Sequence, residues 1–573
     1  MVLAATGAVG FFVGMILEPT WQDVIEPGQV LAGLVDYPAD NPVFLYSTRT
    51  WTLLHQISAA LLLAGFSERT LALLLSGVVG MLSLQALGTT IFALSDDVPL
   101  ACATPFFVFF TRATSGGLAY PVMLAGSEYT SGVVGLSFLL LVCAMIGAGE
   151  YACGAFLLGI IPAVHVTLGA WCALIVGLTA WLGDREVRTQ LLRAWGWLGV
   201  GAAVSGLSAV LHFARVAPVD GLTSDESARY FWAVMTYWDA HRRPFTRLSI
   251  QAVPFLIGTA VSAVWLRRFR ATLPRASSFL LGALLVSAVL GAALSVVLAV
   301  DPGFARGLLW RAMPSRLMNL PLLACMAVII GIGGGLKSNL RGQLTLATLV
   351  GTLAAVYVVA LAATGRLVTV SYVAMFATAL FLAGAAREMA QGGAATPVPG
   401  RAFRVSRLVT IGTPVLLLVI AAMDARAHFS DNGDVLADRT TSEVFAAAAG
   451  RTGLLLTASN IHLAQLKTRR PVLVDGAAID GLAYVPEAAP ATERILREVY
   501  GIELLAPPFS PRSAVGSVPA DTGKRLWEDR TAADWVTLGH RFGVTDVLTF
   551  ADWRLHLPEV ARADGFVLYA ISQ

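Results

Sequence analysis

Residues 131–148 read SGVVGLSFLLLVCAMIGA, an uncharged run long enough to cross a bilayer as a helix. Similar apolar segments recur on both sides of it. Across the whole chain of 573 residues, 56% are hydrophobic and 13% are charged, whereas soluble domains carry about 25% charge. The sequence therefore predicts a polytopic α-helical membrane protein with about thirteen spans. They are expected at 1–17, 49–65, 70–95, 98–112, 131–148, 153–182, 190–213, 248–266, 277–300, 318–336, 343–364, 367–386 and 406–423.

Basic residues mark one set of alternate loops, and such loops are retained in the cytoplasm. The opposite loops, 18–48, 214–247 and 301–317, are then predicted to face outward, with the N-terminus inside and everything after Met423 outside. The basic loops contain Arg185, Arg188 and Arg193; Arg267, Arg268, Arg270 and Arg275; Lys337 and Arg341; and Arg387, Arg401, Arg404 and Arg407.

Composition changes near Asp424, where charged residues, prolines and short strand-like runs replace the long apolar segments. We expect a transmembrane domain over 1–424 and a small extracytoplasmic α/β domain over 425–573 with a mainly parallel sheet. Strands are expected at 453–458, 471–475, 545–550 and 565–571, with helices at 491–500 and 531–542.

Several function classes lack their signatures. A net charge of +3 gives no case for binding nucleic acid, and the five cysteines lie in apolar runs without metal-ligand spacing. The glycine run at 331–335 lacks the Lys-Ser/Thr of a P-loop, so an ATP-driven transporter is not indicated. Neither Gly-x-Ser-x-Gly nor His-Glu-x-x-His occurs in the C-terminal domain, so a hydrolase is not indicated either.

The first outer loop concentrates carboxylates beside aromatic residues. Asp36 and Asp40 are the strongest candidates for chemistry, because the neighbouring prolines would hold them on an ordered turn. A carboxylate at this boundary can act as general base toward a hydroxyl, or can hold a divalent cation such as Mg²⁺ or Mn²⁺ against a phosphate. The alternative is that an acidic outer loop only follows topology and turn chemistry.

Arginines in two later outward loops run against the positive-inside trend. The segment 237–245 contains His241, Arg242 and Arg243, and the segment 310–316 contains Arg311 and Arg316. Arginine forms bidentate contacts with phosphate, so these residues, together with Asn41 of the first loop, are predicted to bind a lipid-linked phosphate substrate. Contacts with lipid headgroups or with the acidic loop are the alternative.

This pattern resembles the GT-C superfamily of polytopic glycosyltransferases. The resemblance rests on the acidic loop after the first span, on the many spans, on the C-terminal α/β domain, and on the tail segments 535–549 and 566–571. It implies a polyprenyl-phosphate-linked sugar donor, a glycan, lipid or protein acceptor, and a first-loop base, here Asp36 or Asp40 with Asp23 as a third candidate. It also implies a bacterial inner membrane location. Unlike the family pattern, the loop has no adjacent Asp-Asp or Asp-Glu pair.

Two other classes remain open. A transporter or flippase of a lipid-linked or anionic substrate needs a polar path through the bilayer, for which His55 and His165 are the main candidates. A scaffold whose outer domain binds a partner is the third class. We expect no catalytic residue in 425–573, where Asp475, Asp480 and Asp552 are interpreted as turn residues or helix caps.

Overall fold

The computed structural model confirms an integral membrane protein. Four helices in the described part are long and apolar enough to cross a membrane, at Glu68–Ser95, Trp195–Phe213, Ala276–Val300 and Leu308–Ile332. The predicted spans 343–364, 367–386 and 406–423, most of 98–112, and the boundary at 424 lie outside the described residues, so the count of thirteen stays a prediction. The structure describes residues 1–17, 22–102, 104, 131–214, 216, 221–239, 252–269, 275–335, 442–458, 461, 463–509, 518 and 520–571.

The chain divides into two compact units. The first comprises Met1–Thr20, Leu73–Leu207 and Pro244–Asp434, and is helical throughout its described part. Its elements, with α5 and α12 continuing into the other unit, are α1 (Val2–Leu17), α5 (Glu68–Ser95), α6 (Val98–Cys102), α8 (Ser131–Gly147), α9 (Tyr151–Val164), α10 (Val166–Leu182), α11 (Arg185–Arg193), α12 (Trp195–Phe213), α14 (Ala252–Phe269), α15 (Arg275–Val300), η3 (Phe304–Gly307), α16 (Leu308–Ala312), η4 (Pro314–Met318) and α17 (Asn319–Gly335).

Small residues let the helices of this unit approach closely. Gly10 and Gly14 of α1 face Ser76 and Gly80 of α5, where a Cβ built on Gly14 would lie 2.1 Å from the Ser76 carbonyl oxygen. A Cβ on Gly80 would lie 2.2 Å from the Gly10 carbonyl oxygen. Close backbone approach is a principal source of helix association in lipid, where the hydrophobic effect between helices is absent.

Two predicted spans differ from the structure. The expected single span 153–182 is two helices, α9 and α10, separated at His165, whose backbone is extended (φ −155°, ψ 104°) and whose Nδ1 accepts a hydrogen bond from Leu168 N. The bend is sharp, because a Cβ on Gly169 would lie 2.8 Å from Pro162 backbone atoms. The expected span 49–65 is the shorter helix α4 (Leu53–Leu63), which begins where the Thr52 side chain accepts from Leu54 N.

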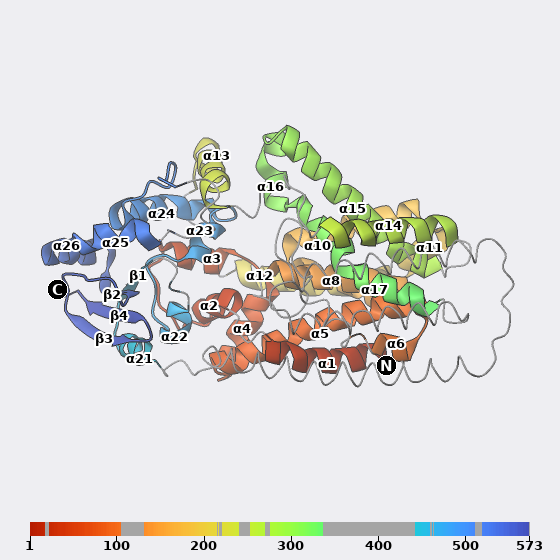
Figure 1. Cartoon of the computed structure of the whole chain (residues 1–573), viewed down its shortest axis with the longest axis horizontal. Helices are drawn as coiled ribbons and strands as arrows, with labels where there is room; N and C mark the ends of the chain where they lie inside the picture. Colours follow the sequence, from red (N-terminus) through yellow and green to blue (C-terminus); the bar gives the residue numbers. More distant parts are fainter. Residues whose placement is uncertain are drawn as a thin grey trace, which may run out of the picture. The chain divides into compact units, whose positions relative to one another are not determined.

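The second unit joins three distant stretches, Trp21–Ala72, Ser208–Arg243 and Val435–Gln573. It therefore contains most of the first loop (18–48) as well as the C-terminal domain, and Figure 1 shows α2 and α3 beside α22 and α23. Its loop elements are α2 (Gln22–Leu31), α3 (Pro42–Arg49), α4, α13 (Ser224–Ala233) and η2 (Val234–Trp238). Its C-terminal elements are α21 (Glu443–Ala449), β1 (Leu454–Thr457), α22 (Ala464–Thr468), α23 (Gly476–Gly481), η5 (Pro486–Ala488), α24 (Ala489–Ile495), η6 (Leu496–Tyr500), α25 (Ala520–Glu528), α26 (Ala532–Phe542), β2 (Val544–Phe550), β3 (Glu559–Ala563) and β4 (Phe566–Ala570).

The C-terminal sheet has the order β1-β2-β4-β3, and the prediction that it is mainly parallel is wrong. Among the four described strands, β1 and β2 pair in parallel, while β2–β4 and β3–β4 are antiparallel. The reason is a hairpin at Asp564-Gly565, where φ is +53° and +79°, as a tight turn between antiparallel strands requires. The stretch 471–475 contributes an isolated parallel bridge, Leu455–Val472, and is not a full strand.

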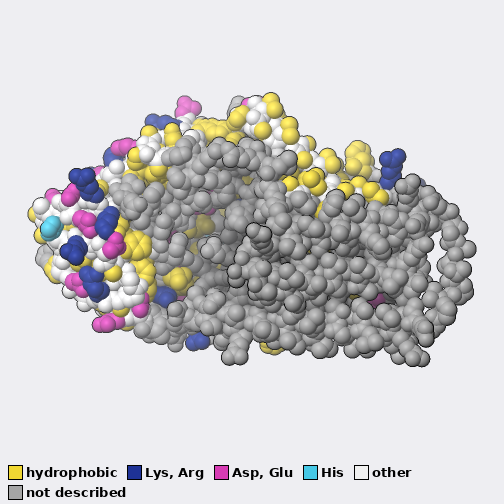
Figure 2. All heavy atoms as spheres, viewed as in Figure 1, with side chains coloured by type: hydrophobic (Ala, Val, Ile, Leu, Met, Phe, Trp, Pro, Cys, Tyr) yellow, Lys and Arg dark blue, Asp and Glu magenta, His cyan; other side chains and the backbone are white. Residues whose placement is uncertain are grey.

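The exposed surfaces of the two units differ in kind. Charged side chains of both signs are mixed over the described part of the C-terminal domain, whereas hydrophobic side chains gather along α15 (Figure 2). Val289, Val296 and Val300 of α15 are all exposed. Such a face is suited to contact with lipid chains.

Candidate functional site

The predicted acidic residues lie on a turn with alternating burial, which we name the acidic turn (residues 35–41). Val35, Tyr37 and Asn41 are buried, whereas Asp36 and Asp40 are exposed. Both candidate carboxylates therefore face solvent from a backbone that is held by its buried neighbours. Asp23 lies in α2, and its side chain is outside the described residues.

Asn41 anchors the end of the acidic turn. Its Oδ1 accepts from the amides of Val43 (2.8 Å) and Phe44 (3.3 Å), which caps α3, with Pro42 at the first helical position. Its Nδ2 donates to the carbonyl oxygens of Val472 (3.2 Å) and Leu473 (3.1 Å). This role is structural, and the predicted contact of Asn41 with substrate stays a prediction.

Tyr37 anchors the middle of the turn. Its hydroxyl donates to Gln465 Oε1 (2.6 Å) and accepts from Val472 N (3.1 Å). Burial raises the pKa of this hydroxyl well above its usual range, and the carboxylates of Asp475 and Glu26 act in the same direction. The hydroxyl is therefore a stable donor at neutral pH.

A buried polar network joins α2 to α22. Gln465 Nε2 donates to the Glu26 carbonyl oxygen (2.9 Å) and to Gln29 Oε1 (3.2 Å). Gln29 Nε2 donates to Glu68 Oε1 (3.0 Å), and Arg469 Nε donates to the same oxygen (2.6 Å). Sequence reasoning missed the contacts of Gln465 and Arg469 with the first part of the chain, because their partners Gln29 and Glu68 lie about four hundred residues away.

One charged group of the C-terminal domain approaches a candidate base. Arg494 NH2 lies 3.9 Å from Asp40 Oδ2, and both side chains are at least half exposed. Exposed pairs of this length contribute little to stability. The contact leaves the Asp40 carboxylate accessible to a substrate.

The predicted arginines belong to the first unit or lie outside the described residues. His241, Arg242 and Arg243 are among the latter. Arg311 lies in α16 and is partly exposed, whereas Arg316 lies in η4 and is buried. The two are thus placed on one connection between α15 and α17, and their predicted convergence with Asp36 and Asp40 stays a prediction.

Tryptophans fix this connection. Trp310 Nε1 donates to the Pro302 carbonyl oxygen (2.8 Å), and Trp171 Nε1 of α10 donates to the Ala312 carbonyl oxygen (2.7 Å). Met313, between α16 and η4, has a φ of +45°. The Arg311–Arg316 connection is therefore held at several points and is not a loose loop.

Three aspartates of the C-terminal domain, Asp475, Asp480 and Asp552, are interpreted from the sequence as turn residues or helix caps. Asp475 caps α23 by accepting from Ala478 N (2.7 Å), which confirms its interpretation as a helix cap. Asp552 pairs with Lys524 Nζ at 2.5 Å on the surface, and Asp480 lies within α23. The expectation that 425–573 supplies no catalytic residue stays a prediction.

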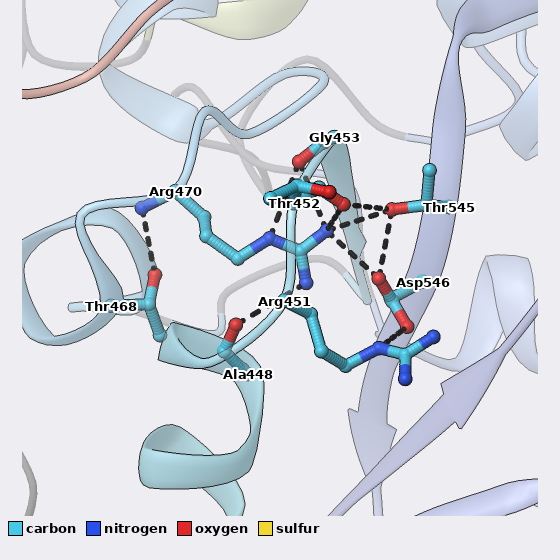
Figure 3. Close-up of polar contacts among 8 residues, drawn as sticks. All are labelled: Ala448, Arg451, Thr452, Gly453, Thr468, Arg470, Thr545 and Asp546. Atoms are coloured by element: carbon cyan, nitrogen blue, oxygen red, sulfur yellow. Dashed lines mark hydrogen bonds and ion pairs between the residues drawn. The ribbon is translucent and has the colours of Figure 1, made fainter.

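A buried carboxylate that the sequence analysis did not single out is Asp546 of β2 (Figure 3). Its Oδ2 pairs with Arg470 NH2 at 2.8 Å and its Oδ1 with Arg451 Nε at 2.5 Å. A charged residue inside the otherwise apolar run 544–550 is the signal that could have identified it. Arg470 NH2 also donates to Thr545 Oγ1 (2.9 Å), so Arg470 and Asp546 form a buried ion pair, which the exposed Arg451 joins from the surface.

No cluster of three or more His, Cys, Asp or Glu side chains suited to a metal ion occurs within the part of the chain that the structure describes. The divalent cation considered from the sequence stays a prediction.

No protein-family model matches the chain, and no curated protein matches it. The structure is similar to the crystal structure of ArnT from Cupriavidus metallidurans bound to undecaprenyl phosphate, over 100% of this chain and 97% of that one, with 14% sequence identity and a TM-score of 0.41.

Proposed function

We propose that this membrane protein is a glycosyltransferase of the GT-C type. It moves a sugar from a polyprenyl-phosphate donor to a hydroxyl of a glycan, lipid or protein acceptor at the outer membrane face. The observation that supports this most is the acidic turn, which presents Asp36 and Asp40 to solvent between the buried anchors Tyr37 and Asn41. The activity fits an ordered general base next to the membrane.

The proposed reaction is a single displacement with inversion. Asp36 or Asp40 accepts the proton of the acceptor hydroxyl, whose oxygen forms a bond to the anomeric carbon as the bond to the lipid phosphate breaks. The leaving phosphate carries away the electron pair. A base must lie within hydrogen-bond reach of the hydroxyl, which exposed carboxylates on a fixed backbone permit.

Arginines stabilise the departing phosphate in this proposal. Arg311 and Arg316 share one fixed connection, and His241, Arg242 and Arg243 complete the proposed phosphate site. Guanidinium groups suit this role because they bind phosphate oxygens bidentately and stay charged at all physiological pH values. A divalent cation held by the first-loop carboxylates is an added element of the proposal.

The test replaces the candidate bases in the full-length protein. Asp36→Asn, Asp40→Asn and the double variant are expressed in membranes, and transfer from a polyprenyl-phosphate sugar is measured at equal protein level. General-base assistance is worth roughly 10²- to 10⁴-fold, so the variant that removes the base loses about that factor in turnover. Asp552→Asn, an exposed aspartate of the same unit, is the matched control and keeps full turnover.

Full transfer by the double variant would overturn the assignment. If the unmodified protein transfers no sugar to an acceptor but moves a lipid-linked sugar across the membrane, the transporter or flippase is favoured instead.

A further inference from the structure

The contact between the first loop and the C-terminal domain is built from buried polar side chains, although apolar packing alone could hold the two segments together. Glu26, Gln29 and Gln465 are each less than a tenth exposed, yet they meet through hydrogen bonds and not through apolar packing. Apolar residues of similar volume often hold two elements together equally well or better. A fully bonded polar group, by contrast, fixes one register, because any other arrangement leaves buried donors and acceptors unpaired.

Gln465 is the centre of this contact. Its Oε1 accepts from the Tyr37 hydroxyl at 2.6 Å, and its Nε2 donates to the Glu26 carbonyl oxygen and to Gln29 Oε1. Both ends of the side-chain amide are therefore used on the first loop. The neighbouring Leu466 N donates to Glu26 Oε1 at 3.1 Å and so repeats the attachment through the backbone.

The residues that attach the acidic turn to the C-terminal domain directly follow the two candidate bases in the chain. Asp36 is followed directly by Tyr37, and Asp40 is followed directly by Asn41. Tyr37 accepts from the amide of Val472, while Asn41 donates to the carbonyl oxygen of the same residue. The residue that follows each candidate base therefore hydrogen-bonds to Val472 of the C-terminal domain.

Val472 is in turn fixed to the sheet. The amide of Leu455 in β1 donates to the Pro471 carbonyl oxygen (2.8 Å), and the amide of Leu473 donates to the Leu455 carbonyl oxygen (2.9 Å). A continuous set of hydrogen bonds therefore runs from β1 through 471–473 to the acidic turn. Tyr37 and Asn41 of the acidic turn hydrogen-bond to the backbone of Val472 and Leu473 in this segment.

We propose that Tyr37, Asn41 and Gln465 are positioning residues: through them the C-terminal domain sets the direction of the Asp36 and Asp40 carboxylates. This inference rests on the proposed function and extends it, because it gives the C-terminal domain a part in the transfer step without a catalytic residue. Misplacement by about 1 Å can lower a rate roughly 10²-fold.

The central experiment compares two tyrosine hydroxyls in the full-length protein. Tyr37→Phe removes the hydroxyl that bonds Gln465 and Val472, whereas Tyr569→Phe removes a buried hydroxyl that donates to the Trp553 carbonyl oxygen (2.9 Å). Tyr37→Phe loses two buried hydrogen bonds and Tyr569→Phe loses one, so both variants lower Tm. Only Tyr37→Phe is expected to lower kcat, by roughly 10- to 100-fold, with the donor KM unchanged. Equal kcat in the two variants would overturn the inference.

A double-mutant cycle tests whether Tyr37 and Gln465 act through their shared hydrogen bond. Gln465→Met removes the acceptor of the Tyr37 hydroxyl, so the two substitutions break the same contact. The double variant Tyr37→Phe/Gln465→Met is therefore expected to lose less kcat than the product of the two single losses. Independent, multiplying losses would show that the two residues do not act through one contact, and would contradict the inference.

A second readout does not depend on sugar transfer. Hydrogen exchange of the amides in 32–41 rises in Tyr37→Phe and stays at the unmodified level in Tyr569→Phe, since only the former detaches the turn. Unchanged exchange in both variants would refute the positioning role. Full transfer by the Asp36→Asn/Asp40→Asn variant would refute the proposed function instead, so the two failures are told apart.

Discussion

Arg470 and Asp546 show at residue scale how the C-terminal domain closes its interior. Arg470 is 3% exposed, and its guanidinium donates to the carbonyl oxygens of Thr452 and Gly453 as well as to Asp546. Burial lowers the pKa of Arg470, and the Asp546 carboxylate opposes that shift. The charge is retained inside the domain because the carboxylate and the carbonyl oxygens replace its hydration.

Asp546→Ala is therefore expected to destabilise the protein strongly. Removing one partner of a buried ion pair leaves the other uncompensated and costs about 3–5 kcal/mol. Asp552→Ala is the matched control, because Asp552 also lies 2.5 Å from its cationic partner but on the surface, where no measurable change is expected. Thermal and denaturant unfolding in detergent, followed by tryptophan fluorescence, measures both. Equal Tm values would contradict a stabilising role for the buried pair.

Residues could be assigned from the sequence where their partners are local. Asp475 reaches an amide only three residues ahead, so its role as a cap is predictable. Tyr37, Asn41 and Asp546 take their roles from partners that are distant in the chain: Val472 is 435 residues from Tyr37, and Arg451 is 95 residues from Asp546. No short pattern contains that information. Sequence patterns thus identified the acidic turn but not what holds it.

At element scale, hydropathy predicts that a stretch is apolar but not how many helices it forms. The run 153–182 has no charged residue, yet it bends at His165 because Pro162 lies one turn before the break. The hairpin at Asp564-Gly565 carried a clear turn signal, and recognising it would have predicted the antiparallel part of the sheet.

The close approach of α1 and α5 gives a prediction of its own. Gly14→Ala places a Cβ 2.1 Å from the Ser76 carbonyl oxygen, so the helices must separate and Tm falls. Gly199→Ala in α12 is the control, since a Cβ there meets nothing within 4 Å. Alanine favours a helix by about 1 kcal/mol over glycine, so the control keeps or raises Tm. A fall of the same size in both variants would show that the α1–α5 contact is not the cause.

At the scale of the whole molecule, the second unit is built from two loop stretches and the C-terminal domain. The hydrogen bond between Tyr37 and Gln465 requires the first loop and the C-terminal domain to be on the same side of the membrane. A boundary drawn from composition at 424 separates them, because composition records hydropathy and not packing. The sequence predicts that this shared side is the outer side.

Single cysteines in a cysteine-free variant test that prediction. Glu150→Cys and Glu186→Cys lie in exposed positions before α9 and after α10. The arginines of α11 favour the cytoplasm, so an impermeant maleimide labels Glu150→Cys in intact cells and labels Glu186→Cys only after permeabilisation. Arg525→Cys in α25 is labelled in intact cells. Labelling of both Glu150→Cys and Glu186→Cys without permeabilisation would mean that α9 and α10 cross the membrane twice.

The length of chain between the acidic turn and its anchor sets the order of events during biosynthesis. Tyr37 and Gln465 are 428 residues apart, and at about 5–20 residues per second the ribosome needs roughly 20–90 s to make the second after the first. During that interval the Tyr37 hydroxyl and the Asn41 Nδ2 lack the partners that Gln465, Val472 and Leu473 later provide. Under the proposed function, the acidic turn is held for transfer only after the residues from Gln465 to Leu473 have been made and folded, so the nascent chain transfers sugar slowly until then.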